Sequence, residues 1–435
     1  MSSSKTEKVQ QELTSSTPTS KLSLRGNSPV LPENVEEEEF PEGGARAWLV
    51  VLGSAVALFA TFGYANAVGV FLEYYGSHQL VNESPSSIAW IGSLQVFILL
   101  GSGLFSGPLF DQHGEKVIYP PIVLYIFSVM MTSISTKLWH FILAQGLLGG
   151  LTMGMMLGPC MAATGQYFKK KRAAAMGLTI GGSSIGGVVF PIMLSKLFAN
   201  PNLSFGWTVR ICGFMMVPLL AITAYTVKAR LPSRKGTFFL PEAFKSPPYV
   251  ALIVSMFCAT LGIFVPMFYI PTYAVQHGMS VQLASYLASI FNGASFFGRA
   301  IPGLLADKIG GFNMLTATTL CSGIMIFCWT RAVTNSPIVV FAAMYGFFSG
   351  GLVSLMSFSF MSVTNDPKKF GTYYGMAMSI TSVAALIGPP ITGALVNRYG
   401  RFDEAAWFSG VAVLVGGVGV ILTKSLTGKG MLSRT

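Results

Sequence analysis

The sequence predicts an all-α membrane protein whose helices, about twelve in number, form two pseudo-symmetric six-helix bundles. Of its 435 residues, 52% are hydrophobic and only 10% are charged, and the mean hydropathy is +0.59. From residue 47 onward, nearly the whole chain divides into apolar stretches of about 20 residues, the length that crosses a bilayer as a helix. A composition this apolar excludes a water-soluble globular protein.

Short linkers rich in Gly, Pro, Asn and charged residues separate the predicted spans, which favours hairpins of antiparallel helices. A longer polar segment, 228–248, is predicted to be a cytoplasmic loop between an N-terminal bundle, 46–227, and a C-terminal bundle, 249–424. The segment 1–45 is rich in Ser, Thr, Glu and Pro and is predicted to be a disordered cytoplasmic tail, and 425–435 to be a cytoplasmic C-terminus. The spans are expected at 47–71, 86–108, 117–135, 138–162, 172–197, 206–227, 249–273, 281–304, 312–330, 336–361, 371–396 and 404–424.

The positive charge predicts the orientation of the chain. Most of the 28 Lys and Arg residues, including the run at 169–172, fall at one set of helix ends, and cytoplasmic loops carry such an excess. The net charge of +11 is therefore read as a topology signal, and since no basic face repeats, nucleic acid is not expected as a partner. Asn82 and Asn202 begin Asn-x-Ser patterns in the predicted outer loops, where glycosylation is expected. The plasma membrane is the expected location.

The motif G-x-x-x-D occurs after the second span, at 107–111, and again after the eighth, at 303–307. Glycine allows helices to pack closely, and a carboxylate stabilises the N-terminus of a neighbouring helix. For a single copy, an aspartate that merely caps the next helix is an equal alternative. Two copies favour a latch that gates one end of the bundle, and the predicted gating residues are Asp111, Lys116, Asp307 and Lys308.

A second correspondence joins the fifth and eleventh spans. Gly177 and Pro191 are matched by Gly375 and Pro389, each 198 positions later. The two halves are therefore interpreted as copies of one unit.

The paired motifs resemble the signature loop of the major facilitator superfamily, and the resemblance covers 43–424. Within that superfamily the chain resembles the monocarboxylate transporter-like family in its fungal branch. The segments that carry this resemblance are 42–48 (EGGARAW), 90–95 (WIGSLQ), 167–173 (YFKKKRA) and 292–303 (NGASFFGRAIPG). The resemblance implies alternating access, in which two bundles rock about a solute site near the bilayer midplane and expose it first to one side and then to the other.

Arg299 is the most informative residue, because a charged group inside a span costs at least about 2.5 kcal/mol and persists where function requires it. In the family that the chain resembles, the arginine at this place in the eighth span pairs with the substrate carboxylate. Arg299 is therefore predicted to bind an organic anion through its bidentate fork. The alternative is an arginine that snorkels to the interface or braces Asp307.

Two positions depart from the proton-coupled members of that family, which carry an aspartate and a lysine where this chain has Ser295 and Asn66. Neither side chain can take up and release a proton during transport. Every Asp and Glu from residue 47 onward lies at or beyond the end of a predicted helix. Lactate-type proton symport is thus the lesser interpretation. The predicted substrate-binding residues are Arg299, Asn66, Asn292, Ser295, Tyr64 and Tyr269.

The expected function is the transport, by alternating access, of a small organic solute that bears a carboxylate. Export of a secondary metabolite, or a non-transporting nutrient sensor of the same fold, are the alternatives. A G-x-S-x-G pattern at 182–186 lies in a Gly-rich span that lacks His and acid partners, so an enzyme is not expected. The scattered His and Cys residues predict neither a metal site nor a cofactor. A monomer in the lipid bilayer is expected to be the functional unit.

Overall fold

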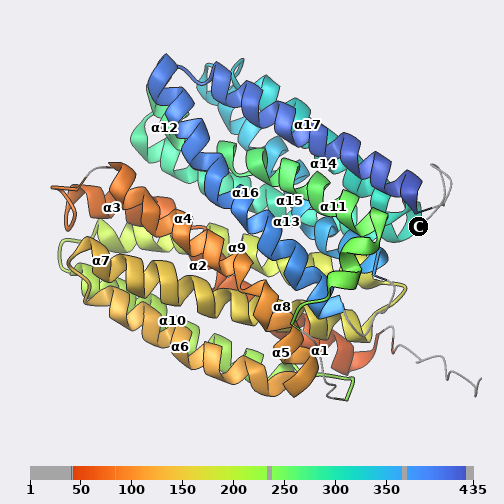
Figure 1. Cartoon of the computed structure of the whole chain (residues 1–435). Coiled ribbons are helices and arrows are strands. Elements are labelled where there is room, and N and C mark those ends of the chain that lie inside the picture. The colour runs from red at the N-terminus through yellow and green to blue at the C-terminus, as the bar shows by residue number, and fades with distance from the viewer. Residues whose placement is uncertain (1–40, 42, 84, 233–237, 365–369, 428–435) are drawn as a thin grey trace, which may run out of the picture. The chain divides into compact units, whose positions relative to one another are not determined.

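Helices build the fold, and no strand occurs among the residues that the computed structural model describes, which are 41, 43–83, 85–232, 238–364 and 370–427. Most of the predicted tail 1–45 and of the C-terminal segment 425–435 lies outside these residues. The helices of the N-terminal half are α1 Gly44–Ala60, α2 Phe62–Ala65, α3 Val68–Ser77, α4 Pro85–Gly101, α5 Gly103–His113, α6 Tyr119–Ser133, α7 Leu138–Phe141, the π-helix η2 Ile142–Gly149, α8 Gly150–Tyr167, α9 Arg172–Phe198 and α10 Phe205–Thr226. Those of the C-terminal half are α11 Pro247–Ile263, α12 Val265–Gln276, α13 Val281–Ile309, α14 Gly311–Trp329, α15 Asn335–Ser362, α16 Phe370–Tyr399 and α17 Asp403–Leu426 (Figure 1).

Ten helical stretches of the described chain are long and apolar enough to cross a membrane. One of them, Trp90–Ser133, includes two predicted spans that join through the 3-10 turn η1, Gly114–Ile118. The predicted span 281–304 is α13, which is not among the ten; its sequence is rich in small and polar residues. The described helices thus account for each of the predicted spans, while the length and hydropathy criterion by itself confirms fewer.

The first and seventh spans are interrupted near their middle. In the first, the Thr61 hydroxyl donates to the Ala57 carbonyl at 2.7 Å, and the chain leaves the regular helix again between α2 and α3 at Asn66. In the seventh, α11 stops at Ile263 and α12 begins directly before Pro266. Proline lacks the N–H that the preceding turn needs and its ring clashes with that turn, so an interruption at this point is expected. Polar and irregular backbone is therefore present at the depth of the cavity described below.

The glycine motif lies partly inside helices rather than in a loop as predicted. Gly107 and Asp111 belong to α5, which continues to His113, and the turn follows at Gly114, where φ is +59°. The second copy behaves alike, since α13 continues through Asp307 to Ile309 and the turn lies at Gly310, where φ is +108°. Glycine adopts such left-handed backbone without steric cost. The motif therefore places its aspartate on the last turns of a helix.

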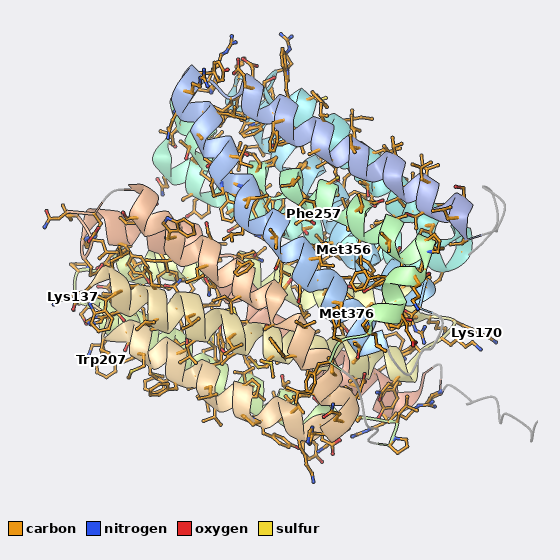
Figure 2. The ribbon with its side chains drawn as sticks, viewed as in Figure 1. Lys137, Lys170, Trp207, Phe257, Met356 and Met376 are labelled. Carbon is orange, nitrogen blue, oxygen red and sulfur yellow. The ribbon has the colours of Figure 1, made fainter. Side chains whose placement is uncertain are left out.

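One end of the bundle, at which α1, α9 and α16 begin and α10, α13 and α17 end, carries Lys169, Lys170, Lys171, Arg172, Lys228, Lys308 and Lys424. We refer to it as the basic end, and it is the end that the charge distribution predicts to be cytoplasmic. Figure 2 shows Lys170 at this end and Lys137 at the opposite one.

The two halves contact each other chiefly through α9 with α13 and through α16 with α5 and α4. The approach is close enough that a Cβ atom added to Gly177 would lie 2.5 Å from the Arg299 carbonyl oxygen. Likewise, a Cβ atom at Gly107 would lie 2.2 Å from the Gly371 carbonyl oxygen. Only glycine permits such backbone contact. At the opposite end, α3 and α12 make their principal contacts with helices of their own half.

Candidate functional site

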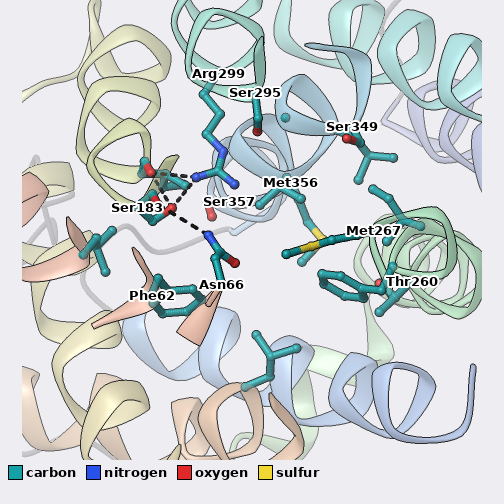
Figure 3. A pocket seen from close by; sticks show the side chains of 18 of the residues that line it. Phe62, Asn66, Ser183, Thr260, Met267, Ser295, Arg299, Ser349, Met356 and Ser357 are labelled. Atoms are coloured by element: carbon teal, nitrogen blue, oxygen red, sulfur yellow. Dashed lines mark hydrogen bonds between the residues drawn. The ribbon is translucent and has the colours of Figure 1, made fainter. Parts of the chain in front are cut away.

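A cavity of about 140 Å³ lies between the two halves (Figure 3). Its walls come from α1, α2, α4, α8 and α9 of the N-terminal half and from α11, α12, α13, α15 and α16 of the C-terminal half. Four of the six predicted substrate-binding residues line it, namely Asn66, Asn292, Ser295 and Arg299. Among the described residues of the lining, Arg299 is the one with an ionised side chain.

Arg299 reaches from α13 across to α9 of the other half. Its Nη1 atom donates to the Ile180 carbonyl oxygen at 2.8 Å and also to the Ser183 hydroxyl. Its side chain is 9% exposed, and its Nε atom is buried without a hydrogen-bond partner among the described residues. A guanidinium has five N–H donors, and Nε together with Nη2 forms the side-on edge that binds carboxylates in bidentate fashion. Arg299 therefore uses Nη1 for hydrogen bonds within the protein, whereas its Nε has no acceptor there.

The Ser183 side chain was not predicted as a site residue. Its hydroxyl donates to the Ile180 carbonyl oxygen at 2.9 Å while accepting the bond from Arg299, and its own carbonyl oxygen accepts from Asn66 Nδ2 at 3.4 Å. One feature of the sequence marks it, namely a polar residue inside the small-residue run 181–187 of a span. That signal does not tell Ser183 from Ser184, because only the rotation of α9 about its axis decides which of them faces α13.

Asn66 and Asn292 form an amide pair across the two halves. Asn66 Nδ2 donates to Asn292 Oδ1 at 3.1 Å, and Asn292 Nδ2 donates to the Ala288 carbonyl oxygen at 2.9 Å. A Cβ atom at Gly187 would lie 2.6 Å from Asn292 Oδ1 and 2.8 Å from Asn66 Nδ2, so this glycine makes room for the pair. Together with Ser183 and Arg299, the two amides form a continuous polar strip on one wall of the cavity.

The opposite wall is apolar with neutral hydroxyl groups. Figure 3 shows Met267, Thr260 and Ser349 across the cavity from Ser183. Methionine side chains are flexible and polarisable, so they fit irregular apolar and aromatic surfaces. Other residues of the cavity lining include Phe264, Phe291, Met356, Met378, Ser357, Tyr374 and Thr381, and Ser357 donates to the Tyr374 hydroxyl at 3.0 Å. Phe62 lies on the side of Asn66 (Figure 3). This arrangement suits an amphipathic molecule with a charged acceptor group at one end.

Tyr64 and Tyr269, the two other predicted binding residues, do not line this cavity. Tyr64 is 3% exposed and packs edge-on against Phe71 and Phe190 inside the N-terminal half. The Tyr269 hydroxyl donates to the Pro389 carbonyl oxygen at 3.0 Å. Aromatic residues at helical spacing fill the core of a bundle as often as they line a cavity, and Phe62 and Met267, a few positions away, occupy the cavity instead.

The two gating aspartates lie at helix N-termini of the opposite half. The Asp307 carboxylate on α13 accepts from the backbone N–H groups of Ala173 at 3.3 Å and Ala174 at 3.2 Å, in the first turn of α9. Asp111 on α5 lies against the start of α16, where a Cβ atom at Gly371 would be 2.9 Å from Asp111 Oδ2. Carboxylates are favoured there, because free N–H groups and the positive end of the helix dipole both face them. Lys116 and Lys308 are exposed at the same end.

The predicted glycosylation residues, Asn82 and Asn202, are both exposed at the end opposite to the basic end. Asn82 follows α3, and Asn202 lies between α9 and α10. In the described part of the chain, no three His, Cys, Asp or Glu side chains come together in a way that could hold a metal ion.

Several fungal proteins are similar to this chain. The Aspyridones efflux protein apdF of Emericella nidulans is 51% identical over 404 residues, which are 92% of this chain and 83% of that protein. The Agnestins efflux protein AgnL12 of Paecilomyces divaricatus is 36% identical over 441 residues, which are 99% of each chain.

Solved structures of low sequence identity share the fold. The fucose:proton symporter FucP of E. coli superposes with a TM-score of 0.67 at 14% identity and covers 87% of this chain and 99% of its own. The human organic anion transporter MFSD10 superposes with a TM-score of 0.67 at 15% identity and covers 88% of this chain and 98% of its own. At such identity these two structures support the fold only.

A sequence model of the Major Facilitator Superfamily matches residues 50–330. With the family model, the fungal relatives and the shared fold in agreement, this multi-pass integral membrane protein is a transporter, not an enzyme, and it belongs to the Major Facilitator Superfamily.

Proposed function

We propose that this transporter exports an amphipathic organic acid of the secondary-metabolite class by alternating access. The direction rests on the relatives, two of which carry names as efflux proteins for aspyridones and for agnestins. Those names favour export, which was one of the alternatives in the sequence analysis. The main expectation there assigned no direction of transport.

The acidic group of the substrate is inferred from Arg299, the observation that carries this proposal. The guanidinium is buried in the cavity wall, and no carboxylate occurs among the described residues that line this cavity. A buried charge without a counter-ion is costly unless a ligand supplies one. A carboxylate or another acidic oxygen pair on the substrate meets that need at Nε and Nη2.

The body of the substrate is inferred from the opposite wall. The thioethers of Met267, Met356 and Met378 and the rings of Phe264 and Phe291 favour an apolar or aromatic skeleton. Neutral hydroxyl groups among them favour a skeleton that also carries oxygen. A solute as small and polar as lactate would leave this wall without contacts, so the monocarboxylate resemblance stays a prediction about ancestry rather than about substrate.

The remaining expectations belong to the same proposal. The transporter functions as a monomer in the plasma membrane, with its basic end in the cytoplasm and Asn82 and Asn202 on the outside. The latches of Asp307 and Asp111 hold the cytoplasmic end closed while the site faces outward. The buried positive charge of Arg299 and the duplicated carboxylate contacts support this arrangement.

Inside-out membrane vesicles from a host that expresses the full chain test the proposal, because uptake into them corresponds to export. The panel comprises 4-coumarate, salicylate, lactate and the neutral 4-hydroxybenzyl alcohol, each radiolabelled. We expect accumulation of the aromatic acids above that of lactate and of the alcohol, and a loss of at least about tenfold in Arg299→Ala.

Arg210→Ala is the matched control. Arg210 lies on α10 outside the cavity, where its Nε atom donates to the Ser133 hydroxyl at 3.2 Å and its guanidinium lies over Trp207. The control variant should transport like the wild type. Acid transport that survives Arg299→Ala in normally inserted protein, or preference for the neutral alcohol, would contradict the proposal.

A further inference from the structure

The cavity holds a permanent positive charge that nothing in its own lining can neutralise. Arg299 lines it, and Asp, Glu and His are absent from the described residues of the lining, so none of the described side chains there takes up or releases a proton near neutral pH. The nearest gating carboxylates, Asp111 and Asp307, are engaged with helix N-termini at the basic end. Protonation at physiological pH therefore cannot change the charge of the cavity.

The charge is placed where the two halves must separate. Arg299 Nη1 lies on α13 and its acceptors, the Ile180 carbonyl and the Ser183 hydroxyl, lie on α9 of the other half. The duplicated contact between α5 and α16 has no such group, because Gly103 stands on α5 where Arg299 stands on α13. Opening of the basic end thus breaks the hydrogen bonds of a buried arginine at the α9–α13 pair, in addition to the carboxylate contact that both pairs have.

Switching between the two open states also passes through a state in which both ends are closed and water is excluded from the cavity. In that state the unpartnered Nε of an empty carrier would be sealed in a low-dielectric cavity with an uncompensated charge. An acid bound on the side-on edge supplies both the acceptors and the counter-charge. The loaded carrier can therefore switch, whereas the empty one cannot.

From this asymmetry we propose that the transporter is an obligatory exchanger of organic anions. This proposal rests on the proposed function and adds a second substrate to it. The carrier returns to the cytoplasmic side only with another acid, which is taken up from outside and held by the same edge of Arg299. The counter-substrate is a carboxylate-bearing molecule that fits the cavity, and neither a proton nor a metal ion can take its place. Export is then driven by the gradient of the entering anion.

Spin-label distances on the empty carrier test the inference without a substrate. One label pair, at Tyr225 of α10 and Leu426 of α17, reports on the basic end, and a second pair, at Val81 and Val333, reports on the opposite end. These four residues are exposed. Cys258, Cys321 and Cys328 are first replaced by Ser so that they do not react with the label, whereas Cys160 and Cys212 are buried and can stay. The empty wild type should show one short distance at the basic end.

Two substitutions separate charge from packing. Arg299→Ala removes the charge and should let the empty carrier populate both states, so that a second, longer distance appears at the basic end. Arg299→Lys keeps the charge, so the empty carrier should stay closed at the basic end. Ser184→Ala is the control and should behave like the wild type, because the Ser184 hydroxyl is buried without a bond to Arg299. An open basic end in more than about a tenth of empty wild-type molecules would overturn the inference, as would equal behaviour of Arg299→Ala and Arg299→Lys.

A flux measurement completes the test and separates this inference from the proposed function. Proteoliposomes are loaded with labelled 4-coumarate, and its efflux is followed with and without unlabelled 4-coumarate outside. Exchange predicts that the external acid raises efflux at least tenfold. If efflux is equal with and without the external acid, exchange is rejected and acid export still stands. If no coumarate flux occurs at all, the proposed function is contradicted, and the spin-label distances alone decide whether the empty carrier can switch.

Discussion

At the scale of single residues, the proposed recognition of an acid depends on the guanidinium of Arg299, part of which is already bonded to the protein. Arg299 gives Nη1 to Ile180 and Ser183 and thereby fixes the plane of its fork. A fork held in place loses less rotamer freedom when it binds a carboxylate. Ser183 is therefore a positioning residue that acts through Arg299.

Ser183→Ala should weaken binding of a transported acid by about tenfold, the effect of one hydrogen bond to a charged group. The apparent KM should rise while the maximal rate changes little, since Ile180 still holds Nη1. Ser183→Thr, which keeps the hydroxyl, should restore the affinity. Ser184→Ala in the same turn is the control, and an equal rise in KM for both alanine variants would show that Ser183 acts only through packing.

At the scale of helices, the proposed gate consists of two contact pairs, α9 with α13 and α5 with α16. Both use a carboxylate on the last turns of one helix against the first turn of a helix in the other half. Such a contact is strong enough to hold an end closed and, at the surface, weak enough to break, because the macrodipole contributes up to about 1 kcal/mol at an exposed site.

Asp307→Asn should shift the conformational equilibrium by about 1 kcal/mol, or about fivefold, toward an open basic end, because an amide lacks the charge that the N-terminus of α9 favours. The distance between labels at Tyr225 and Leu426 measures this shift in the presence of a transported acid. Asp403→Asn, in the first turn of α17 at the other end, provides the control. A distribution unchanged by Asp307→Asn would remove Asp307 from the gate.

Gly177→Leu should act in the same direction through steric pressure. Its Cβ atom would lie 2.5 Å from the Arg299 carbonyl oxygen, so α9 and α13 cannot keep their present separation. Overpacking of this kind costs about 1–3 kcal/mol. The same label pair should report a longer distance, whereas Gly69→Leu on α3, where a new Cβ has nothing within 4 Å, should leave it unchanged. A closed basic end in Gly177→Leu would contradict the packing described here.

At the scale of the whole molecule, the sequence predicted the class of fold, because hydropathy and charge respond to the membrane before any tertiary contact forms. It missed the interruptions at Thr61, Asn66 and Phe264, since a broken apolar helix has the same hydropathy as a straight one. It also extended the motif at 107–111 into a loop, although Asp111 lies inside α5.

The candidate site was predictable only where charge or a repeat marked it. Arg299 and the two gating aspartates were marked in this way, whereas Ser183, Met267 and Met356 resemble many other residues of the spans until the helices are rotated against each other. For the same reason Tyr64 and Tyr269 were expected in the cavity and lie elsewhere.

The topology of the whole chain predicts that Asn82 and Asn202 face the outside and carry glycans when the protein is made in a eukaryotic host. Both are exposed, at the end opposite to the basic one. Asn82→Gln and Asn202→Gln should each increase electrophoretic mobility, and glycosidase treatment of the wild type should have the combined effect. An acceptor sequence added at 228–232 is the control, and glycosylation there rather than at Asn82 and Asn202 would reverse the orientation.

The central claim is that Arg299 recognises an acidic group on the exported solute, and binding to the purified full chain tests it most directly. Affinities are compared for an aromatic acid that the vesicle panel shows to be transported and for its methyl ester, in the wild type and in Arg299→Ala. We predict that the wild type prefers the acid by about 10- to 100-fold and that Arg299→Ala loses this preference while it still binds the ester. A wild type that binds acid and ester alike, or an Arg299→Ala variant that keeps the preference, would contradict the claim.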